Sequence, residues 1–530
     1  MFAKQSFYPL GTPIYGILIV VYVLVGTDFM TSVKTSIGTV ISSVEGPSSS
    51  GFSFIVDENA RKGQFVIVET VEGRAVARIS SIIKTNRYFE RAESVQEFER
   101  SGKSLTDMFP TDRWEYLVAD AVVLGVYAVN GMLTRSCFPP SPGSKVRLAD
   151  NDTLFKFFGL DFDGLKLGTV EHHDLDVSLN LTKLLQKHLA VLAISGGGKS
   201  YFVSCLLEEL LDRKKPGPAV IVIDTHGEYT GFADDPKYSK NVVVVSGRKF
   251  RIGVPGLSAN YFSEFLSGMS SVQRRELNKF LSMVSTKYRN SPYDIKTILS
   301  EIEGSDIKST TKGILYTLLL DLSTTKLFGS YDNPSLKTLA RAGHLTVVDI
   351  SDMVSQKEKQ IVVTYLARKL FNARRAGIIP PFTLVVEEAH NFVPETATRE
   401  HAISRGIIQT IAREGRKFNA SLCLISQRPI QLSTTALSQC NTHIILRVTN
   451  PYDLDHIGKS SEGLTKDVLK TISSLRVGEA LIVGEAVNYP LFLKVRERKS
   501  IPNEKGMPLE KACEEFCKES EQMKKDLEAF

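Results

Sequence analysis

The stretch "LAVLAISGGGKSYFVSCLLEELL", residues 189–211, decides the fold. Its first six residues, 189–194, are all apolar, and they predict a short buried strand. Three consecutive glycines then interrupt the pattern, and a run with apolar residues at helical spacing follows. A strand, a glycine-rich turn and a helix in this order predict an α/β fold built around a phosphate-binding loop.

The loop residues predict how a nucleotide would be held. Backbone N–H groups can turn toward phosphate oxygens only where side chains do not obstruct them, which is why glycines are needed. Lys199 would neutralise the β- and γ-phosphates, and the Ser200 hydroxyl would face Mg²⁺. Ala193 replaces the first glycine of the motif, but this mechanism does not depend on that position. We therefore expect ATP and Mg²⁺ as cofactors, and a purely structural glycine turn is the alternative. The expected cofactor-binding residues are Ser195, Gly196, Gly197, Gly198, Lys199, Ser200 and Tyr201.

Further buried strands accompany this loop along the chain. Continuous apolar runs separated by helical stretches predict a parallel sheet covered on both faces. Between residues 258 and 338 helical spacing replaces the strands, which predicts a helical insertion within a domain covering 151–500. The expected strands are 219–224, 242–246, 345–351, 383–388, 421–426, 443–448 and 480–484.

Residues 30–150 have a different pattern. Short alternating segments with glycines at the turns predict several closely spaced strands and a small β-barrel. Mixed charges at helical spacing in 501–530 predict an exposed terminal helix.

The segment "IYGILIVVYVLV", residues 14–25, is apolar but shorter than the roughly 20 residues that a membrane helix needs. Its length suits a secretory signal, but export would separate an ATP-dependent enzyme from ATP, so we expect a cytoplasmic protein. The favoured interpretation is that Met30 is the true start and 1–29 an upstream extension. A membrane anchor is the alternative, although we expect no stable membrane association.

Two adjacent carboxylates end another buried strand, in "PFTLVVEEAHNF", residues 381–392. An unpaired buried charge is expensive, so a cation is expected there. In phosphate-loop enzymes such a strand end faces the metal. We therefore expect Glu387 beside Mg²⁺ and Glu388 as the base that polarises the attacking water. The alternative is a pair of exposed carboxylates in a strand-to-helix turn.

The stretch "VIDTHGEYTGF", residues 222–232, offers three more polar side chains at a strand end. Asp224 is a second candidate on the metal side, because ligands of α/β sheets bind at the carboxyl ends of strands. His226 by itself suits a loop histidine with satisfied hydrogen bonds better than a ligand. Glu228 follows it two residues later.

The remaining chemistry lies in "IAREGRKFNASLCLISQRP", residues 411–429. Gln427 closes the strand expected next to the acidic one, where a γ-phosphate sensor belongs. Arg413 and Arg416 precede that strand. Such a cluster is ordinarily a solvated face, but between two candidate catalytic strands it predicts an arginine finger supplied to a neighbouring subunit. That interpretation requires a homo-oligomer.

Bulk properties limit the classes of function. With 530 residues, 42% of them hydrophobic and 23% charged, the chain is long enough for two or three folded domains. The net charge of +6 permits a polyanionic partner without requiring one. The six cysteines show no zinc-binding spacing.

The ordered set "KHLAVLAISGGGKS", "IDTHGEY", "LVVEEAHNF", "IAREGRKF", "ISQRP", "HIILRV" and "ISSLRVGEALIVG" resembles the HerA family of the HerA/FtsK superfamily. The resemblance covers most of residues 37–499. It implies a RecA-like P-loop NTPase core with an N-terminal barrel and a helical insertion, assembled as a hexameric ring that moves along double-stranded DNA using ATP. It also implies a NurA-like nuclease as partner in DNA end resection and repair.

The resemblance also implies functional roles for individual residues. Arg416 matches the family's arginine finger best and Arg413 second, while Glu388, Glu387 and Gln427 match its catalytic acids and sensor. Lys187 stands where relatives often carry arginine near the nucleotide, and a lysine there loses bidentate phosphate contact.

Two other functions stay open at this point. A membrane-tethered conjugation- or packaging-type DNA motor would use the same chemistry but retain 14–25 as an anchor. A nucleotide-gated platform that recruits a nuclease without translocation would need less catalytic equipment than this sequence offers.

Overall fold

The computed structural model describes residues 36–502, with gaps at 43–45, 58, 87–94, 98–99, 101–114, 129–130, 267, 290, 397–401 and 462, and also 510, 511, 513–518 and 520. The apolar segment 14–25 and the proposed start at Met30 lie outside the described residues. Within the described part, no helix has both the length and the apolar character to cross a membrane. The chain forms two compact units, which meet in sequence at Leu154 and Phe155.

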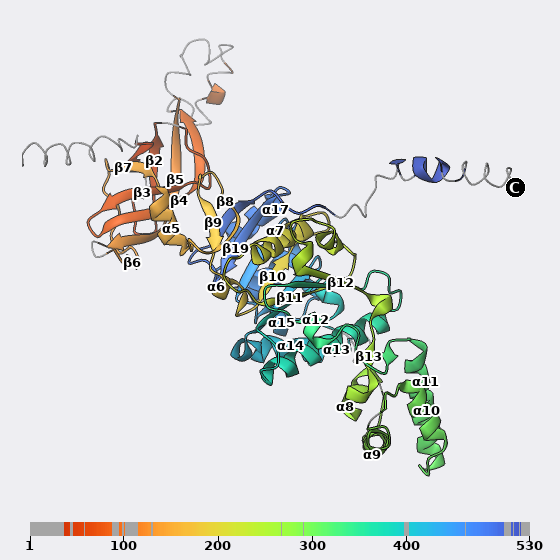
Figure 1. The fold of residues 1–530 in the computed structure, drawn as a ribbon. Helices are drawn as coiled ribbons and strands as arrows, with labels where there is room; N and C mark the ends of the chain where they lie inside the picture. Colours follow the sequence, from red (N-terminus) through yellow and green to blue (C-terminus); the bar gives the residue numbers. More distant parts are fainter. Residues whose placement is uncertain are drawn as a thin grey trace, which may run out of the picture. The chain divides into compact units, whose positions relative to one another are not determined.

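The first unit is a small β-barrel (Figure 1). Its strands pair in the order β2, β1, β7, β3, β4, β5, and a further pairing of β2 with β5 closes the circle. Alternating residues such as Phe54, Val66 and Ala77 are fully buried and fill the interior, as expected for strands with one inward face. The six strands are β1 (Gly38–Ile41), β2 (Gly51–Val56), β3 (Phe65–Thr70), β4 (Gly73–Asn86), β5 (Glu115–Ala128) and β7 (Lys145–Leu148).

The second unit is organised around one eleven-stranded sheet. Seven strands are parallel and adjacent in the order β12, β15, β11, β16, β17, β10, β18. The strand before the phosphate loop, β10, is thus separated from the acidic strand β16 by β17, which is the arrangement of a RecA-like core. These strands are β10 (Leu189–Leu192), β11 (Ala219–Asp224), β12 (Val242–Ser246), β15 (Leu345–Asp349), β16 (Phe382–Val386), β17 (Ala420–Ser426) and β18 (Thr442–Ile445).

The prediction of a parallel sheet is confirmed for seven of the eleven strands and does not describe the other four. Four further strands, β19, β20, β8 and β9, extend the sheet beyond β18 in antiparallel pairs. The apolar run at 480–484 is one of these strands, and its composition carries no information on direction. They are β8 (Leu165–Val170), β9 (Asp176–Leu179), β19 (Glu479–Gly484) and β20 (Leu491–Val495).

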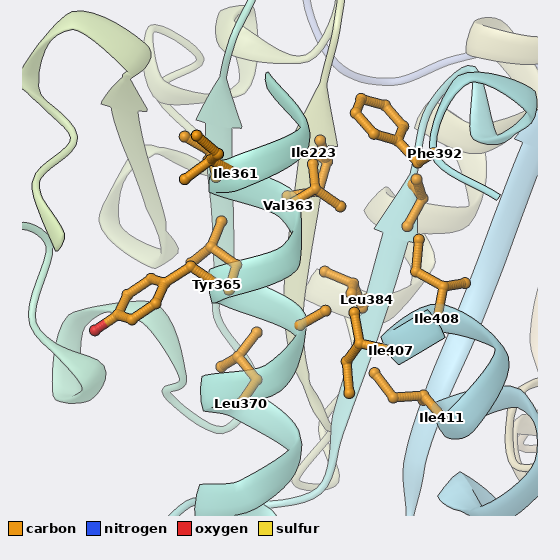
Figure 2. Close-up of a cluster of buried hydrophobic side chains, with 14 of the residues drawn as sticks. Ile223, Ile361, Val363, Tyr365, Leu370, Leu384, Phe392, Ile407, Ile408 and Ile411 are labelled. Carbon is orange, nitrogen blue, oxygen red and sulfur yellow. The ribbon is translucent and has the colours of Figure 1, made fainter. Parts of the chain in front are cut away.

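Helices α13 (Gln356–Arg375) and α14 (Arg405–Glu414) pack on the parallel half of the sheet. Figure 2 shows Val363 of α13 beside Ile223 of β11, and Ile408 of α14 beside Leu384 of the acidic strand. Because these side chains are completely buried, the strand ends that carry polar residues are held on a rigid support.

The expected helical insertion is present as α8 (Ala259–Phe265), α9 (Ser271–Lys287), α10 (Ile295–Glu303) and α11 (Ser309–Thr324). Figure 1 shows these helices gathered at one end of the second unit, beyond β13 (Ile252–Gly253). A two-residue strand, β14 (Phe328–Gly329), pairs with β13 and returns the chain to the sheet.

Candidate nucleotide-binding and catalytic site

The phosphate loop lies between β10 and helix α7 (Lys199–Leu211). Gly196 and Gly198 have φ angles of 71° and 89°, which side-chain-bearing residues rarely adopt. A Cβ atom at Gly197 would lie 3.0 Å from the Ile194 carbonyl oxygen. The loop conformation therefore favours glycine at all three positions. Ala193, where the motif has a glycine, is completely buried and its methyl group belongs to the core.

The loop opens into a cavity of about 460 Å³ at the carboxyl ends of the parallel strands, which we call the nucleotide cavity. It brings together the loop and residues that follow β11, β16 and β17. Its lining residues are Ser195, Gly196, Gly198, Lys199, Ser200, Tyr201, His226, Glu228, Glu387, Glu388 and Gln427.

Lys199 and the two expected acids therefore face one cavity. Burial raises the pKa of Glu388 above the ordinary carboxyl value, although the Lys199 ammonium is close enough to oppose this shift. Lys199 Nζ also donates to the Ile194 carbonyl oxygen at 3.3 Å. Charges of both signs around one cavity are what a magnesium–triphosphate group would require.

Glu387 is 3% exposed and connects two strand ends. Its Oε2 accepts hydrogen bonds from the Thr225 N–H at 2.7 Å and the Thr225 Oγ1 at 2.8 Å. Its Oε1 lies 3.5 Å from His226 Nδ1, and this contact raises the pKa of His226. One carboxylate oxygen thus fixes the loop after β11, while the other remains on the cavity side.

Glu388 adopts a strained backbone conformation, with φ 48° and ψ 47°. Residues other than glycine rarely occupy this left-handed region, and its occupation concentrates at functional sites. The side chain is 5% exposed, and among the described residues its Oε2 has no hydrogen-bond partner. The backbone N–H of Gln427 is close enough to the carboxylate to oppose the rise of its pKa. Glu388 also lines the nucleotide cavity, where a carboxylate can accept a proton from water.

His390 was missed by sequence reasoning. Its Nδ1 lies 3.2 Å from Glu388 Oε2 and 3.1 Å from Ser426 Oγ. Burial, followed by the charges of Arg428 and Lys199, lowers the pKa of His390 to about 4, so the ring is neutral at pH 7. Its position two residues after Glu388 is the feature of the sequence that could have indicated a place in the site.

His226 and Glu228 also line the cavity, beside the expected residues. The His226 side chain is 55% exposed, which suits a group that meets a ligand better than a buried loop histidine. Sequence reasoning named both residues but assigned neither to the site.

Asp224 serves the loop and is not among the cavity's lining residues. Its Oδ1 accepts from the backbone N–H groups of Gly227 and Glu228 at 2.7 and 3.1 Å, and its Oδ2 from that of Tyr229 at 2.9 Å. Burial and then the neighbouring Glu387 raise the pKa of Asp224. This carboxylate therefore shapes the turn that presents His226 and Glu228.

We expect Asp224→Ala to lower the free energy of unfolding of this unit by roughly 3 kcal/mol, because it leaves buried N–H groups without acceptors. Urea unfolding followed by circular dichroism measures the change. Asp234→Ala, which removes an exposed acid from the same region, should change it by less than about 0.5 kcal/mol. Equal stabilities of the two variants would show that the loop does not depend on Asp224.

Arg413 and Arg416 lie at the amino ends of the parallel strands, opposite the carboxyl ends where the nucleotide cavity lies. They stand at the end of α14 and in the short helix η7 (Gly415–Phe418), both exposed and both before β17. The seven residues of β17, at about 3.3 Å each, place roughly 20 Å between them and Gln427. Neither arginine reaches the nucleotide cavity of its own subunit.

Lys187 lies at this amino edge as well. Its Nζ is 2.5 Å from Glu485 Oε1. Partial burial tends to raise the pKa of Glu485, but the hydrogen bond from Lys187 and the charge of Arg416 lower it overall. Lys187 is thus apart from the nucleotide cavity of its own chain, and it shares a surface with the arginine cluster.

Comparison with known proteins gives a consistent set of similarities. The family profile described as "Helicase HerA, central domain" matches residues 165–370. A probable helicase of Methanocaldococcus jannaschii is 29% identical, over 84% of this chain and 88% of that protein. The DNA double-strand break repair helicase HerA of Pyrococcus furiosus is 27% identical, over 86% and 89%. That of Saccharolobus solfataricus is 25% identical, over 86% and 92%.

Proposed function

From the premise that this chain is a HerA-family protein, we propose that it is an ATP-driven double-stranded DNA translocase of the helicase type. The observation that carries the proposal is the nucleotide cavity, which joins Lys199, Glu388 and Gln427. A phosphate loop alone would support binding. A buried acid in the same cavity as the loop lysine supports hydrolysis as well.

Within this proposal each residue has a role. Lys199 and the loop N–H groups hold the phosphates, and Gln427 senses the γ-phosphate. Glu388 accepts the proton of the attacking water, and the neutral His390 ring lies beside its carboxylate. Ser200 and Glu387 place oxygen atoms, which are the ligands that Mg²⁺ prefers, in the same cavity. When bound, Mg²⁺ would reduce the charge on the phosphate oxygens.

The arginine cluster supports an oligomer. Because Arg416 and Arg413 are exposed and distant from their own cavity, they fit the nucleotide of a neighbouring subunit. A ring, which we take to be a hexamer, satisfies every site at once, since each subunit then gives and receives an arginine.

We further propose that the motor acts in DNA end resection with a NurA-like nuclease. The Pyrococcus and Saccharolobus relatives are DNA double-strand break repair helicases by name, which supports this role.

The test of the proposed function is DNA-stimulated hydrolysis. We expect linear duplex DNA to raise the ATPase rate several-fold, because translocation couples each turnover to a DNA contact. The measurement is phosphate release with and without duplex, and Lys199→Ala provides the inactive control. A wild-type rate that does not respond to DNA would contradict translocation and favour the recruitment platform.

A further inference from the structure

Another cavity, of about 430 Å³, lies at the carboxyl end of β12, and we call it the basic groove. Three of its lining residues are cationic, and none of the described residues that line it is acidic. They are Arg248, Lys249, Arg251, Phe328, Gly329, Ser330, Tyr331 and Asn333. A concave surface with charges of one sign concentrates their field on a ligand of the opposite charge.

The groove is built on a braced backbone. Arg251 and Asn333 exchange backbone hydrogen bonds of 2.8 and 2.9 Å, which join the two segments that form the walls. Asn333 Nδ2 donates to the Lys249 carbonyl oxygen at 2.7 Å. Arg251 Nη1 donates to the carbonyl oxygens of Arg248 and Phe250, both at 2.7 Å. Arg251 is therefore a structural residue of the groove.

The other two cations are directed outward. The Arg248 side chain is 80% exposed, and its only ion pair among the described residues is a 3.6 Å contact with Asp352. Lys249 is also exposed. Neither group is used to hold the fold together, so both remain available to a ligand.

An aromatic ring accompanies these charges. Tyr331 is 74% exposed, so its ring contributes little to the core. Clustered exposed cations are typical of surfaces that bind nucleic acids, and a tyrosine hydroxyl beside them can donate a hydrogen bond to a phosphate oxygen.

The basic groove lies at the same edge of the sheet as the nucleotide cavity. Strand β12 is two strands from β11, a separation of about 10 Å, and both end at this edge. The Ile350 N–H donates to the Asp224 carbonyl oxygen at 2.9 Å, and Asp352, two residues later, accepts from Ser246 Oγ at 2.9 Å. The loops after β11, β15 and β12 are thus hydrogen-bonded to one another.

We propose that the basic groove binds the phosphate backbone of duplex DNA, with Arg248 and Lys249 as the contacting cations. The inference rests on the proposed function, which requires a DNA contact in each subunit but does not assign one. Bases are not read here, because no base-specific arrangement of polar groups is needed for a motor that moves along any sequence.

The test uses the full-length protein with the substitutions Arg248→Ala and Lys249→Ala combined. Binding of a fluorescent duplex, in the presence of a non-hydrolysable ATP analogue, is measured at several salt concentrations. We expect at least about tenfold weaker binding, and a salt dependence shallower by roughly 0.9 for each phosphate that the variant no longer neutralises. The matched control combines Lys466→Ala and Lys470→Ala, which remove the same charge from exposed positions of α17 (Lys466–Ser474).

Both double variants should keep the thermal unfolding midpoint of the wild type. If the groove variant binds duplex with wild-type affinity and salt dependence, the assignment of the groove is wrong, although the proposed function stands. If the control variant weakens binding equally, the effect is one of net charge and the assignment is also wrong. A wild-type protein that fails to bind duplex would instead overturn the proposed function itself.

Discussion

Replacing Glu388 with Gln should reduce ATP hydrolysis by at least about 100-fold, while ATP still binds. The substitution keeps the size of the side chain but removes its ability to accept a proton. Glu388 is 5% exposed, and the His390 ring lies 3.2 Å from its Oε2. Because that ring is neutral at pH 7, the substitution removes no ion pair of the fold. Single-turnover phosphate release and the binding of a fluorescent ATP analogue separate the two effects.

Two controls make this result specific. Glu69→Gln changes an exposed carboxylate of the barrel, 63% accessible, and should leave hydrolysis unchanged. Glu387→Gln should act differently, because Glu387 Oε2 holds the Thr225 N–H and hydroxyl. We expect that variant to bind ATP less well in the presence of Mg²⁺. Normal hydrolysis by Glu388→Gln would assign the base to another group.

The pH profile provides a second measure of the same residue. Burial raises the pKa of Glu388, so the ionised base is lost on acidification at a higher pH than for an ordinary carboxylate. His390, with a pKa of about 4, stays neutral until the solution is more acidic than that. The acidic limb of the rate profile should therefore lie above pH 4 and should disappear in the residual activity of Glu388→Gln.

Much of the parallel sheet was predictable because its strands are buried on both faces. The run 219–224 coincides with β11, which is buried along its whole length, since continuous apolar composition has few other interpretations at that length. The run 242–246 has the same composition and coincides with β12, although this strand lies at the edge of the sheet and Val244 is exposed. Strands β8 and β9 carry polar residues such as Lys166 and Asp176 at the sheet's edge, and their composition resembles that of loops. Strand direction is not encoded in composition, which is why β19 was assigned to the parallel half.

In the candidate site, too, some features could be predicted from the sequence and others could not. Residues at strand ends were predictable, because parallel strands bring their carboxyl ends to one edge. Contacts between those ends were not, since they depend on how each loop folds. Glu387 and Thr225 are 162 residues apart in the chain, and nothing local to either predicts their hydrogen bond. Asp224 has the position of a metal-side residue, but the turn after it uses the carboxylate for its own N–H groups.

Arg416→Ala should lower ATP hydrolysis by about 1,000-fold, because an arginine that stabilises the transition-state charge contributes roughly 10³–10⁵ in rate. Binding of ATP should be retained, since Arg416 lies about 20 Å from the nucleotide cavity of its own subunit. Lys417→Ala removes the same charge from the adjacent exposed position and serves as the control. If Arg413→Ala has the larger effect, the role belongs to that arginine.

Mixing two inactive variants tests whether the arginine acts between subunits. Subunits with Arg416→Ala keep an intact nucleotide cavity, and subunits with Lys199→Ala keep the arginine. In a mixed ring, a cavity of the first kind can receive Arg416 from a neighbour of the second kind. The mixture should therefore hydrolyse ATP well above the rate of either variant alone.

Hydrogen bonds within the chain hold the end of α14 in place, which supports this complementation. His188 Nε2 lies 2.9 Å from the Ala412 carbonyl oxygen, and its Nδ1 accepts from the Leu422 N–H at 3.0 Å. These contacts tie the helix that precedes Arg416 to strand β17, so the arginine is presented from a rigid position. A mixture no faster than its components would mean that the cavity is complete within one chain, and the arginine cluster would then be a solvated face.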